Sequence, residues 1–572
     1  MATDLAPPAS ALQRWVPIVG VLRSYERRSL PFDLIAGLTL WGLVVPEGIA
    51  YAGIAGLAPQ AGLYTLLAGL AAYGIFGTSR QLAASATSAT AALIGSTVAA
   101  LHPADAARYA ALAAALVLLV GIAFLAAGIA RLGFITQFLS RPVTEGFIIG
   151  LAIFVGVGQL NKLFGVEKGS GNVVRKFWHV VTQLDDANWT SFAVGAVAIA
   201  LLFVLPRVAP RIPSGLVVLA AGILVSGAFD LESRRGVEVV GKLPSGLPSL
   251  ALPHIAAADL WTLVPTAVGI LLLGFSEALA VADDLARKHG YEIDPNQELR
   301  AFGIANLASG LFGGMVACGG MSSSAVNDGS GARSQVSVLV TAAATVVTVI
   351  ALTPLFTSLP EAVLAALIIH AISHMLKFRA LRSVARISPT EFWLAVLALA
   401  GVVLIDVLQG LVIAMLASLL LHIYRSSRPH LAVLGFDPAN DRYGDIELHP
   451  AATTIPGVLA VRLDAQLYYA NANTFRAELK SRIAEADPPI GVVVLDAEVQ
   501  FELDVTSLEM LDELVDWLDD HDVGFLVVRP RPRVVATLDQ FGLLERIGDG
   551  RLVESLEVAM QRARSEMARP TA

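Results

Sequence analysis

The apolar residues of this chain occur in long runs rather than in the short alternating pattern of a soluble sheet. Such runs cover residues 110–130, surround residues 201–205 and begin again at residue 392. A helix that crosses a bilayer needs about 20 predominantly apolar residues, and these runs approach that length. The pattern therefore predicts an integral membrane protein.

The hydropathy pattern predicts about fourteen membrane segments. In the first half they are 32–54, 59–76, 84–100, 108–130, 143–160, 190–207 and 213–229; in the second they are 262–284, 297–316, 322–335, 336–356, 360–376, 390–406 and 408–424. The segments that start near Ser85 and Ser322 are short and rich in hydroxyl side chains, so they would span a membrane poorly alone.

The two halves share a weak internal similarity. A Phe-Gly pair is followed, at the same spacing, by two hydroxyl residues and Ala, at 76–77 with 87–89 and at 312–313 with 323–325. Seven segments per half is an odd number, so the second half must run inverted, as in many secondary transporters. Chance similarity among small residues is the alternative interpretation.

The last quarter of the chain has a different composition. Hydrophobic residues make up 55% of the whole chain and charged residues 15%, compared with roughly 25% charged in soluble domains. Residues 431–572 contain 25 acidic and 13 basic side chains, a net charge of −12, whereas residues 1–430 carry +4. We predict a cytoplasmic segment 1–29, a transmembrane transport domain 30–430 and a soluble domain 431–572.

Strands alternate with helices in the acidic domain. Residues 457–463, 491–495 and 524–528 are typical of strands, and residues 470–486 and 506–520 of amphipathic helices, which together predict a small α/β domain. Its acidity argues against nucleic-acid binding, which requires a basic face.

Lysine and arginine fall in every second short loop, which predicts that both termini face the cytoplasm. We expect the chain to lie in the cell (inner) membrane. Cys318 is the only cysteine, so a disulfide within the chain and a cysteine metal site are excluded. No enzyme or nucleotide-binding motif is present. We expect no enzyme activity, no cofactor and no resident metal, with transport driven by an ion gradient.

The two short helices are the first candidate for a binding site. A helix that begins inside the membrane directs unpaired N–H groups and partial positive charge into the cavity at its start. Hydroxyls can donate to the same anion. Tight helix packing by small residues is the alternative. The candidate hydroxyl residues are Ser85, Thr87 and Ser88 at one start and Ser322, Ser323 and Ser324 at the other.

Two carboxylates lie within predicted membrane segments. Glu47 follows Pro46 in the first segment, and Glu277 lies in the corresponding first segment of the second half. An ionisable residue at membrane depth is a functional hypothesis, here for coupling transport to a proton. The alternative is that each carboxylate pairs with a helix end or with Arg80 or Arg333. His370, in an apolar run, is more typical of a structural hydrogen bond than of a proton relay.

Several ordered motifs resemble the SulP anion permease family over nearly the whole chain. They are DLIAGLT at 33–39, PEGIAYA at 46–52, GLY at 62–64, FGTSR at 76–80, NQEL at 296–299 and SAVN at 324–327. The acidic tail is similar to a STAS domain through VLD at 494–496 and DVT at 504–506. The resemblance implies fourteen helices in seven-plus-seven inverted repeats, with core and gate domains.

The resemblance also implies site residues. Carried over by position, the substrate contacts are Glu47, Tyr51, Thr87 and Ser322 to Ser324, and Glu277 matches a membrane carboxylate of bacterial members. This chain has Ser323 where the family commonly has arginine, and Glu47 where it has glutamine. The missing arginine weakens any inference that the site takes a dianion.

The sequence thus predicts a secondary active anion transporter that works by alternating access. Sulfate, bicarbonate and a dicarboxylate all remain open as substrates, and proton and sodium coupling both remain open. We expect a homodimer, with the acidic domain as its regulatory and dimer-forming part. The alternatives are a nucleobase-type permease of the same fold and a membrane-tethered STAS signalling protein. Thr506 matches a position phosphorylated in related STAS proteins, but its spacing to Glu509 also fits a helix cap over residues 507–519.

Overall fold

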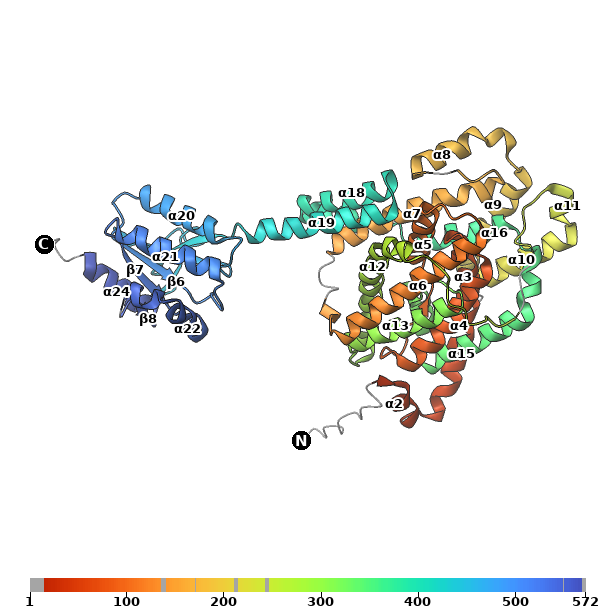
Figure 1. The fold of residues 1–572 in the computed structure, drawn as a ribbon, viewed down its shortest axis with the longest axis horizontal. Helices are drawn as coiled ribbons and strands as arrows, with labels where there is room; N and C mark the ends of the chain where they lie inside the picture. Colours follow the sequence, from red (N-terminus) through yellow and green to blue (C-terminus); the bar gives the residue numbers. More distant parts are fainter. Residues whose placement is uncertain are drawn as a thin grey trace. The chain divides into compact units, whose positions relative to one another are not determined.

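The structure is a computed structural model that describes residues 15–134, 140–169, 171–209, 214–241, 246–548 and 550–567. Its contacts divide the chain into two compact units, Met1–Ser418 and Leu419–Ala572. The first unit is helical, and the second contains a six-stranded sheet with helices (Figure 1).

Each of the fourteen predicted segments corresponds to a helix. In chain order these helices are α3 (Leu30–Ile54), α4 (Pro59–Phe76), α5 (Ser88–Ala100), α6 (Ala106–Ile129), α7 (Arg141–Phe164), α9 (Trp189–Val208), α10 (Ser214–Phe229), α12 (Ala257–His289), α13 (Pro295–Leu311), α14 (Met321–Gly329), α15 (Val336–Val347), α16 (Glu361–Ser373), α18 (Pro389–Leu404) and α19 (Val407–Ser426). The prediction of a polytopic helical fold is confirmed. Four α-helices lie outside the predicted segments in the described residues: α2 (Ile18–Arg23), α8 (Val173–Thr182), α11 (Leu231–Arg235) and α17 (Phe378–Ile387). The predicted segment 336–356 continues past α15 as a π-helical turn at Thr348–Leu352.

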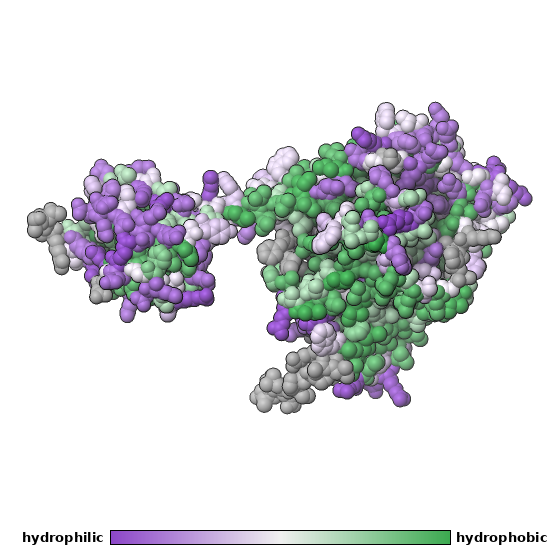
Figure 2. All heavy atoms as spheres, in the orientation of Figure 1, coloured by the Kyte–Doolittle hydropathy of each residue, from purple (hydrophilic) through white to green (hydrophobic). Residues whose placement is uncertain are grey.

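The surface of the helical unit suits a lipid environment. Seven helical stretches in the described residues are long and apolar enough to cross a membrane, and four shorter helices are also apolar. Large apolar side chains are exposed on the outside, including Trp261 and Leu224, and Figure 2 shows broad hydrophobic areas over this unit. Such exposure would be costly in water and is expected against hydrocarbon.

The helices of this unit pack in two groups. The first helix group contains α3 to α6 and α12 to α15, and the second helix group contains α7, α9, α10, α16 and α18. Each group combines helices from both halves of the chain, so neither half forms a core alone. Contacts of α3 with α10 and α16, and of α5 with α7, join the two groups.

Glycines allow the closest helix crossings within each group. A Cβ at Gly62 of α4 would overlap the backbone of Gly48 in α3, and a Cβ at Gly146 of α7 would overlap the backbone of Ala395 in α18. Small residues of this kind let helix backbones approach closely in membranes, where packing drives association.

A two-stranded antiparallel sheet joins the two halves of the chain inside the first helix group. Strand β1 (Ala84–Ser85) immediately precedes α5, and β2 (Cys318–Gly319) precedes α14; Ala84 pairs with Gly319 and Ser85 with Cys318. The chain thus leaves the helical conformation over residues 77–87 and 312–320, with the four paired strand residues at the centre of a buried bundle. Their backbone groups are partly satisfied by each other.

Buried side chains satisfy the backbone on either side of β2. The Asn306 amide donates to the Ala317 carbonyl at 2.9 Å and accepts from the Ala317 N–H at 2.9 Å. Thr65 accepts from the Met315 N–H at 2.6 Å, and Ser309 donates to the Met315 carbonyl at 2.6 Å. These side chains replace the hydrogen bonds that a continuous helix would supply.

The second unit is an α/β domain, as predicted. Its sheet has the strand order β4-β3-β5-β6-β7-β8, with β5, β6, β7 and β8 parallel. The predicted strands are β5 (Val458–Leu463), β6 (Val492–Asp496) and β7 (Gly524–Val528), and the predicted helices are α20 (Ala472–Ala484) and α21 (Val505–Asp519). The elements not predicted are β3 (Leu431–Asp437), β4 (Arg442–Asp445), β8 (Leu552–Val553), α22 (Pro532–Phe541), α23 (Leu543–Ile547) and α24 (Leu556–Met567).

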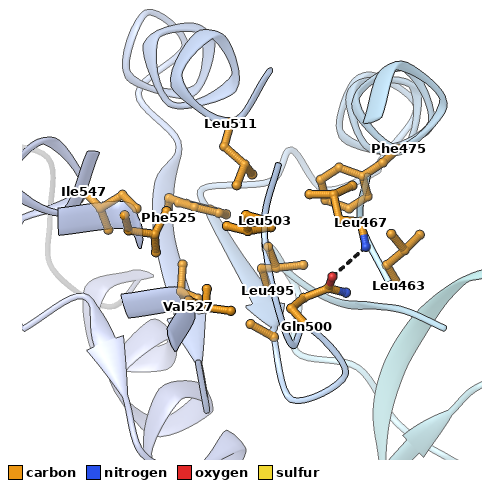
Figure 3. A pocket seen from close by; sticks show the side chains of 13 residues that line it. Leu463, Leu467, Phe475, Leu495, Gln500, Leu503, Leu511, Phe525, Val527 and Ile547 are labelled. Atoms are coloured by element: carbon orange, nitrogen blue, oxygen red, sulfur yellow. Dashed lines mark hydrogen bonds between the residues drawn. The ribbon is translucent and has the colours of Figure 1, made fainter. Parts of the chain in front are cut away.

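One side of this sheet contains an apolar cavity of about 30 Å³ (Figure 3). Its walls include Leu495 and Val527 from the sheet and Phe475 and Leu511 from α20 and α21, with Gln500 at one side. The Gln500 side chain oxygen accepts from the Leu467 N–H at 2.7 Å, so the polar group is already satisfied. The cavity is therefore a packing defect about the size of one methylene group.

We expect the Asn306→Leu variant to be destabilised by about 3 kcal/mol, because the Ala317 N–H and carbonyl would be left buried without partners. Thermal unfolding of the purified full-length protein in detergent measures this as a lower midpoint. A midpoint equal to that of the wild type would show that the backbone near β2 does not depend on this amide.

We expect the Val527→Ile variant to fill the cavity and to stabilise the second unit by about 0.7 kcal/mol, from about 24 cal/mol per Å³ of cavity removed. Thermal unfolding of residues 429–572 expressed alone measures the gain. The control is Val505→Ile, which adds the same methylene at an exposed position and should leave the midpoint unchanged. A lower midpoint for Val527→Ile would show that the cavity cannot accept the group.

Candidate functional site

The strand pair brings the two predicted hydroxyl clusters together. The Ser85 and Ser323 hydroxyls form a hydrogen bond at 3.3 Å, and the Ser324 hydroxyl accepts from the Ala83 N–H at 3.0 Å. Ser323 is 1% exposed and Ser324 is fully buried, so both hydroxyls help to hold the strand pair. Ser322 is exposed, and Thr87 is half-buried.

The starts of α5 and α14 are capped differently. Thr87 caps α5 and accepts from the Thr90 N–H at 3.3 Å, in a reciprocal capping box with the Thr90 side chain. Gly320 caps α14 and has no side chain to offer, so the first N–H groups of α14 keep more of their donor capacity. An anion that approached the exposed Ser322 would meet these donors and the positive end of the helix dipole.

The carboxylate Glu277 lies on the turn of α12 that packs against β2. The Cys318 thiol donates to the Gly274 carbonyl at 2.9 Å, and a Cβ at Gly319 would lie 2.7 Å from the Cβ of Ala278. Glu277 is close enough to Cys318 to interact electrostatically. Cys318 therefore has a structural role: its thiol fastens β2 to α12 beside this carboxylate.

Glu47 lies in the second half of α3, directly after Pro46, and interacts electrostatically with Tyr51 one turn later. Pro46 has no N–H, so the helix lacks one backbone hydrogen bond just before Glu47. Within the described residues, neither the Glu47 nor the Glu277 side chain forms an ion pair or a hydrogen bond.

The proposed arginine partners of these carboxylates are engaged elsewhere. Arg80 lies over the Tyr291 ring at 4.9 Å, and Arg333 lies over the Phe32 ring at 3.7 Å. The alternative in which Glu47 or Glu277 pairs with Arg80 or Arg333 is therefore wrong, because aromatic rings at the ends of the helices hold both guanidinium groups.

His370 packs edge-on against Phe203, with ring centroids 4.8 Å apart, and against His374 at 5.1 Å. Its buried Nδ1 has no hydrogen-bond partner among the described residues. The expected structural hydrogen bond through this nitrogen is not found, and the ring is held by aromatic packing instead.

Two motif carboxylates that sequence reasoning left without a role hold the loops around the site. Glu298 of α13 is buried and accepts from Tyr73 at 2.7 Å and from the N–H and hydroxyl of Thr78 at 2.7 and 2.6 Å. Asp33 of α3 accepts from the Arg333 and Ser334 N–H groups at 2.7 and 3.1 Å. The first loop leads into β1, and the second follows α14.

The cap of α21 differs from the predicted one. The helix begins at Val505 with Asp504 as its cap, and Asp504 accepts from the Ser507 N–H at 2.8 Å. Partial burial would raise the pKa of Asp504, but hydrogen bonds from Ser507 and the Tyr469 N–H outweigh it and lower that pKa. The prediction that Thr506 caps the helix is wrong. Thr506 is exposed, and its hydroxyl has no partner in the part of the chain that the structure describes.

One side-chain cluster in the second unit has the composition of a metal site. The ligand atoms of His430, Asp445 and Asp464 lie within 4.8 Å of one another. However, His430 is bonded to Asp445 at 2.8 Å, and Arg462 to Asp464 at 2.6 Å. Each of these two carboxylates thus already has a side-chain partner, so the cluster is explained without an ion.

Comparison with known proteins identifies both units. Residues 30–398 match the sulfate permease family, and residues 449–559 match the STAS domain. A protein of Mycobacterium tuberculosis named as a probable sulfate transporter is 34% identical over 554 residues, which cover 97% of this chain and 99% of that protein. Sulfate transporter 4.1 of Arabidopsis thaliana, a chloroplast protein, is 29% identical and covers 93% of this chain and 80% of its own length.

Solved structures show the same fold. Murine Slc26a9, an anion transporter in the inward-facing state, has a TM-score of 0.90 at 23% identity and covers 99% of this chain and 96% of its own. The transmembrane domain of the cyanobacterial bicarbonate transporter BicA has a TM-score of 0.60 at 24% identity, covering 69% of this chain and 98% of its own. The resemblance seen in the motifs is thus confirmed: this polytopic membrane protein has an SLC26-like transmembrane fold followed by a STAS domain, and it belongs to the sulfate permease family.

Proposed function

We propose that this protein is a secondary active transporter of a small inorganic anion, working by alternating access. The observation that carries the proposal is the meeting of two helix starts at the β1–β2 pair. There the exposed Ser322 and the half-buried Thr87 lie beside helix dipoles that attract negative charge. The two helix groups, joined by few contacts, provide two bodies that could move around such a site.

The relatives narrow the substrate class. Proteins named as sulfate transporters and a bicarbonate transporter share the sequence or the fold, which favours sulfate or bicarbonate over a dicarboxylate and over a nucleobase. They are named as transporters, in keeping with the expectation that this chain is not an enzyme. Their resemblance over both units also argues against a protein that only signals through its STAS domain.

Glu277 is our candidate for the coupling residue, with Glu47 as the second. Each lies at membrane depth without a fixed partner, and Glu277 is one helical turn from the point where α12 is fastened to β2. A carboxyl group in that position can exchange a proton as the site opens and closes. We favour proton coupling over sodium coupling for this reason.

We further propose that the chain lies in the cell (inner) membrane with both termini in the cytoplasm, that it forms a homodimer and that the STAS domain regulates transport. The exposed Thr506 is the candidate modification site. A phosphate there would add about −1.5 to −2 charge at the second position of α21, beside Asp504 and Glu502. The favourable helix dipole and the two repelling carboxylates would act in opposite directions.

We expect the Ser322→Trp variant to lose anion uptake by more than about tenfold, because the indole would cover the exposed start of α14. The measurement is uptake of radiolabelled sulfate and bicarbonate into proteoliposomes. We place the change at Ser322 because the buried Ser323 would test folding as well. The control is Ser383→Trp, on the exposed side of α17, which should transport normally. Uptake by Ser322→Trp at the wild-type rate would exclude the site.

We expect the Glu277→Gln variant to show a flattened dependence of uptake on pH, since an amide cannot exchange a proton. Initial rates of uptake across a series of pH values, with and without an imposed proton gradient, provide the measurement. Glu292→Gln makes the same change at an exposed loop position and should keep the wild-type profile. If Glu277→Gln also keeps that profile, coupling does not run through Glu277.

A further inference from the structure

The turn between α16 and α17 contacts the starts of both short helices. The Ser88 hydroxyl, at the first residue of α5, donates to the Met375 sulfur at 3.2 Å. The Lys377 ammonium lies 3.9 Å from the sulfur of Met321, the first residue of α14. The turn at residues 374–377, which directly follows α16 of the second helix group, therefore reaches the starts of both short helices in the first helix group.

Lys377 is a free cation at this position. Its side chain is exposed, and no carboxylate lies within ion-pair distance of it in the described ranges of the chain. Its one polar contact is with a thioether, which carries no charge to neutralise the ammonium. Met321 is 60% exposed, so the space around this contact is open to a solute.

The partial charges of the two helix starts are not enough to balance a divalent anion. Neither α5 nor α14 contains a lysine or an arginine. Each helix start contributes roughly half a positive charge, so the two together offer about one. A monovalent anion would be balanced by the helix starts alone, whereas a divalent anion would leave about one negative charge uncompensated. An ammonium at the start of α14 provides that remaining charge.

We propose that Lys377 is an anion-binding residue of this site and that it adapts the site to a divalent oxyanion of the sulfate class. The inference rests on the proposed function, because it assigns a further residue to the same site. Since Lys377 lies in the turn that follows α16 of the second helix group and Ser322 lies in the first helix group, the bound anion contacts both groups. Anion binding is then strongest in the arrangement that brings Lys377 next to Met321.

The test is anion binding by the purified full-length protein in detergent. The midpoint of thermal unfolding is titrated with sodium sulfate or sodium bicarbonate at constant ionic strength set with gluconate. A ligand at free concentration c that binds the folded state stabilises it by RT ln(1 + c/Kd), so the dependence of the midpoint on ligand concentration gives the Kd. Lys377→Gln should raise the Kd for sulfate about tenfold and the Kd for bicarbonate about threefold. The Coulomb energy lost is twice as large for the divalent ion, so the factor for sulfate is about the square of the factor for bicarbonate.

Two variants make the result specific. Lys377→Arg keeps the charge and should restore sulfate binding to within about twofold of the wild type. Arg386→Gln removes a positive charge from the far end of α17 and should bind both anions as the wild type does. If Lys377→Gln matches the wild type, or loses affinity equally for both anions, Lys377 does not supply the charge.

Failure of the inference can be told from failure of the proposed function. If sulfate no longer raises the midpoint of Ser322→Trp but raises that of Lys377→Gln as in the wild type, the anion site at the start of α14 is supported and the role of Lys377 is excluded. If Ser322→Trp responds as the wild type does, the site itself is misplaced. A wild-type protein that responds to neither anion contradicts both proposals.

Discussion

A chain that leaves the helical conformation inside a bilayer must find new partners for its backbone N–H and carbonyl groups, because no water is available there. In this protein β1 and β2 meet that requirement by pairing with each other across the two halves of the sequence. Asn306, Thr65, Ser309 and Ser324 complete it from the side. Everything about the site depends on this solution, since it is the pairing that sets the starts of α5 and α14 beside each other.

The same requirement separates the roles of the hydroxyl residues. The Ser323 and Ser324 hydroxyls form hydrogen bonds that hold the strand pair, and the Ser88 hydroxyl donates to Met375. Ser322, in contrast, is exposed. The neighbouring serines at the start of α14 thus have different roles. The buried carboxylates Asp33 and Glu298 belong to the structural set, because each is surrounded by donors from a loop that enters or leaves the site.

The helices could be predicted from sequence because hydrocarbon requires about 20 apolar residues per crossing, and this requirement is local. The strand pair could not, since two residues such as Ala84 and Ser85 carry no periodicity and their partners lie more than 200 positions away. The cap of α21 was misassigned for a related reason. Asp504 and Thr506 are both good capping residues, and the bond from the Tyr469 N–H to Asp504 is a tertiary contact. Lys377 was visible in the sequence only as one more basic loop residue.

The glycine crossings determine how the helical unit can deform. Because a Cβ at Gly62 would overlap the backbone of Gly48, α3 and α4 interlock at the level of their main chains, and Gly146 with Ala395 does the same for α7 and α18. Helices locked in this way cannot slide along each other without breaking backbone contact. The contacts between the two groups are looser: a Cβ at Gly215 of α10 would lie 3.9 Å from Pro46 of α3, an ordinary van der Waals distance. Sliding motion is therefore confined to the contact surface between the two helix groups. On the side of the first group, that surface includes α3 next to Glu47.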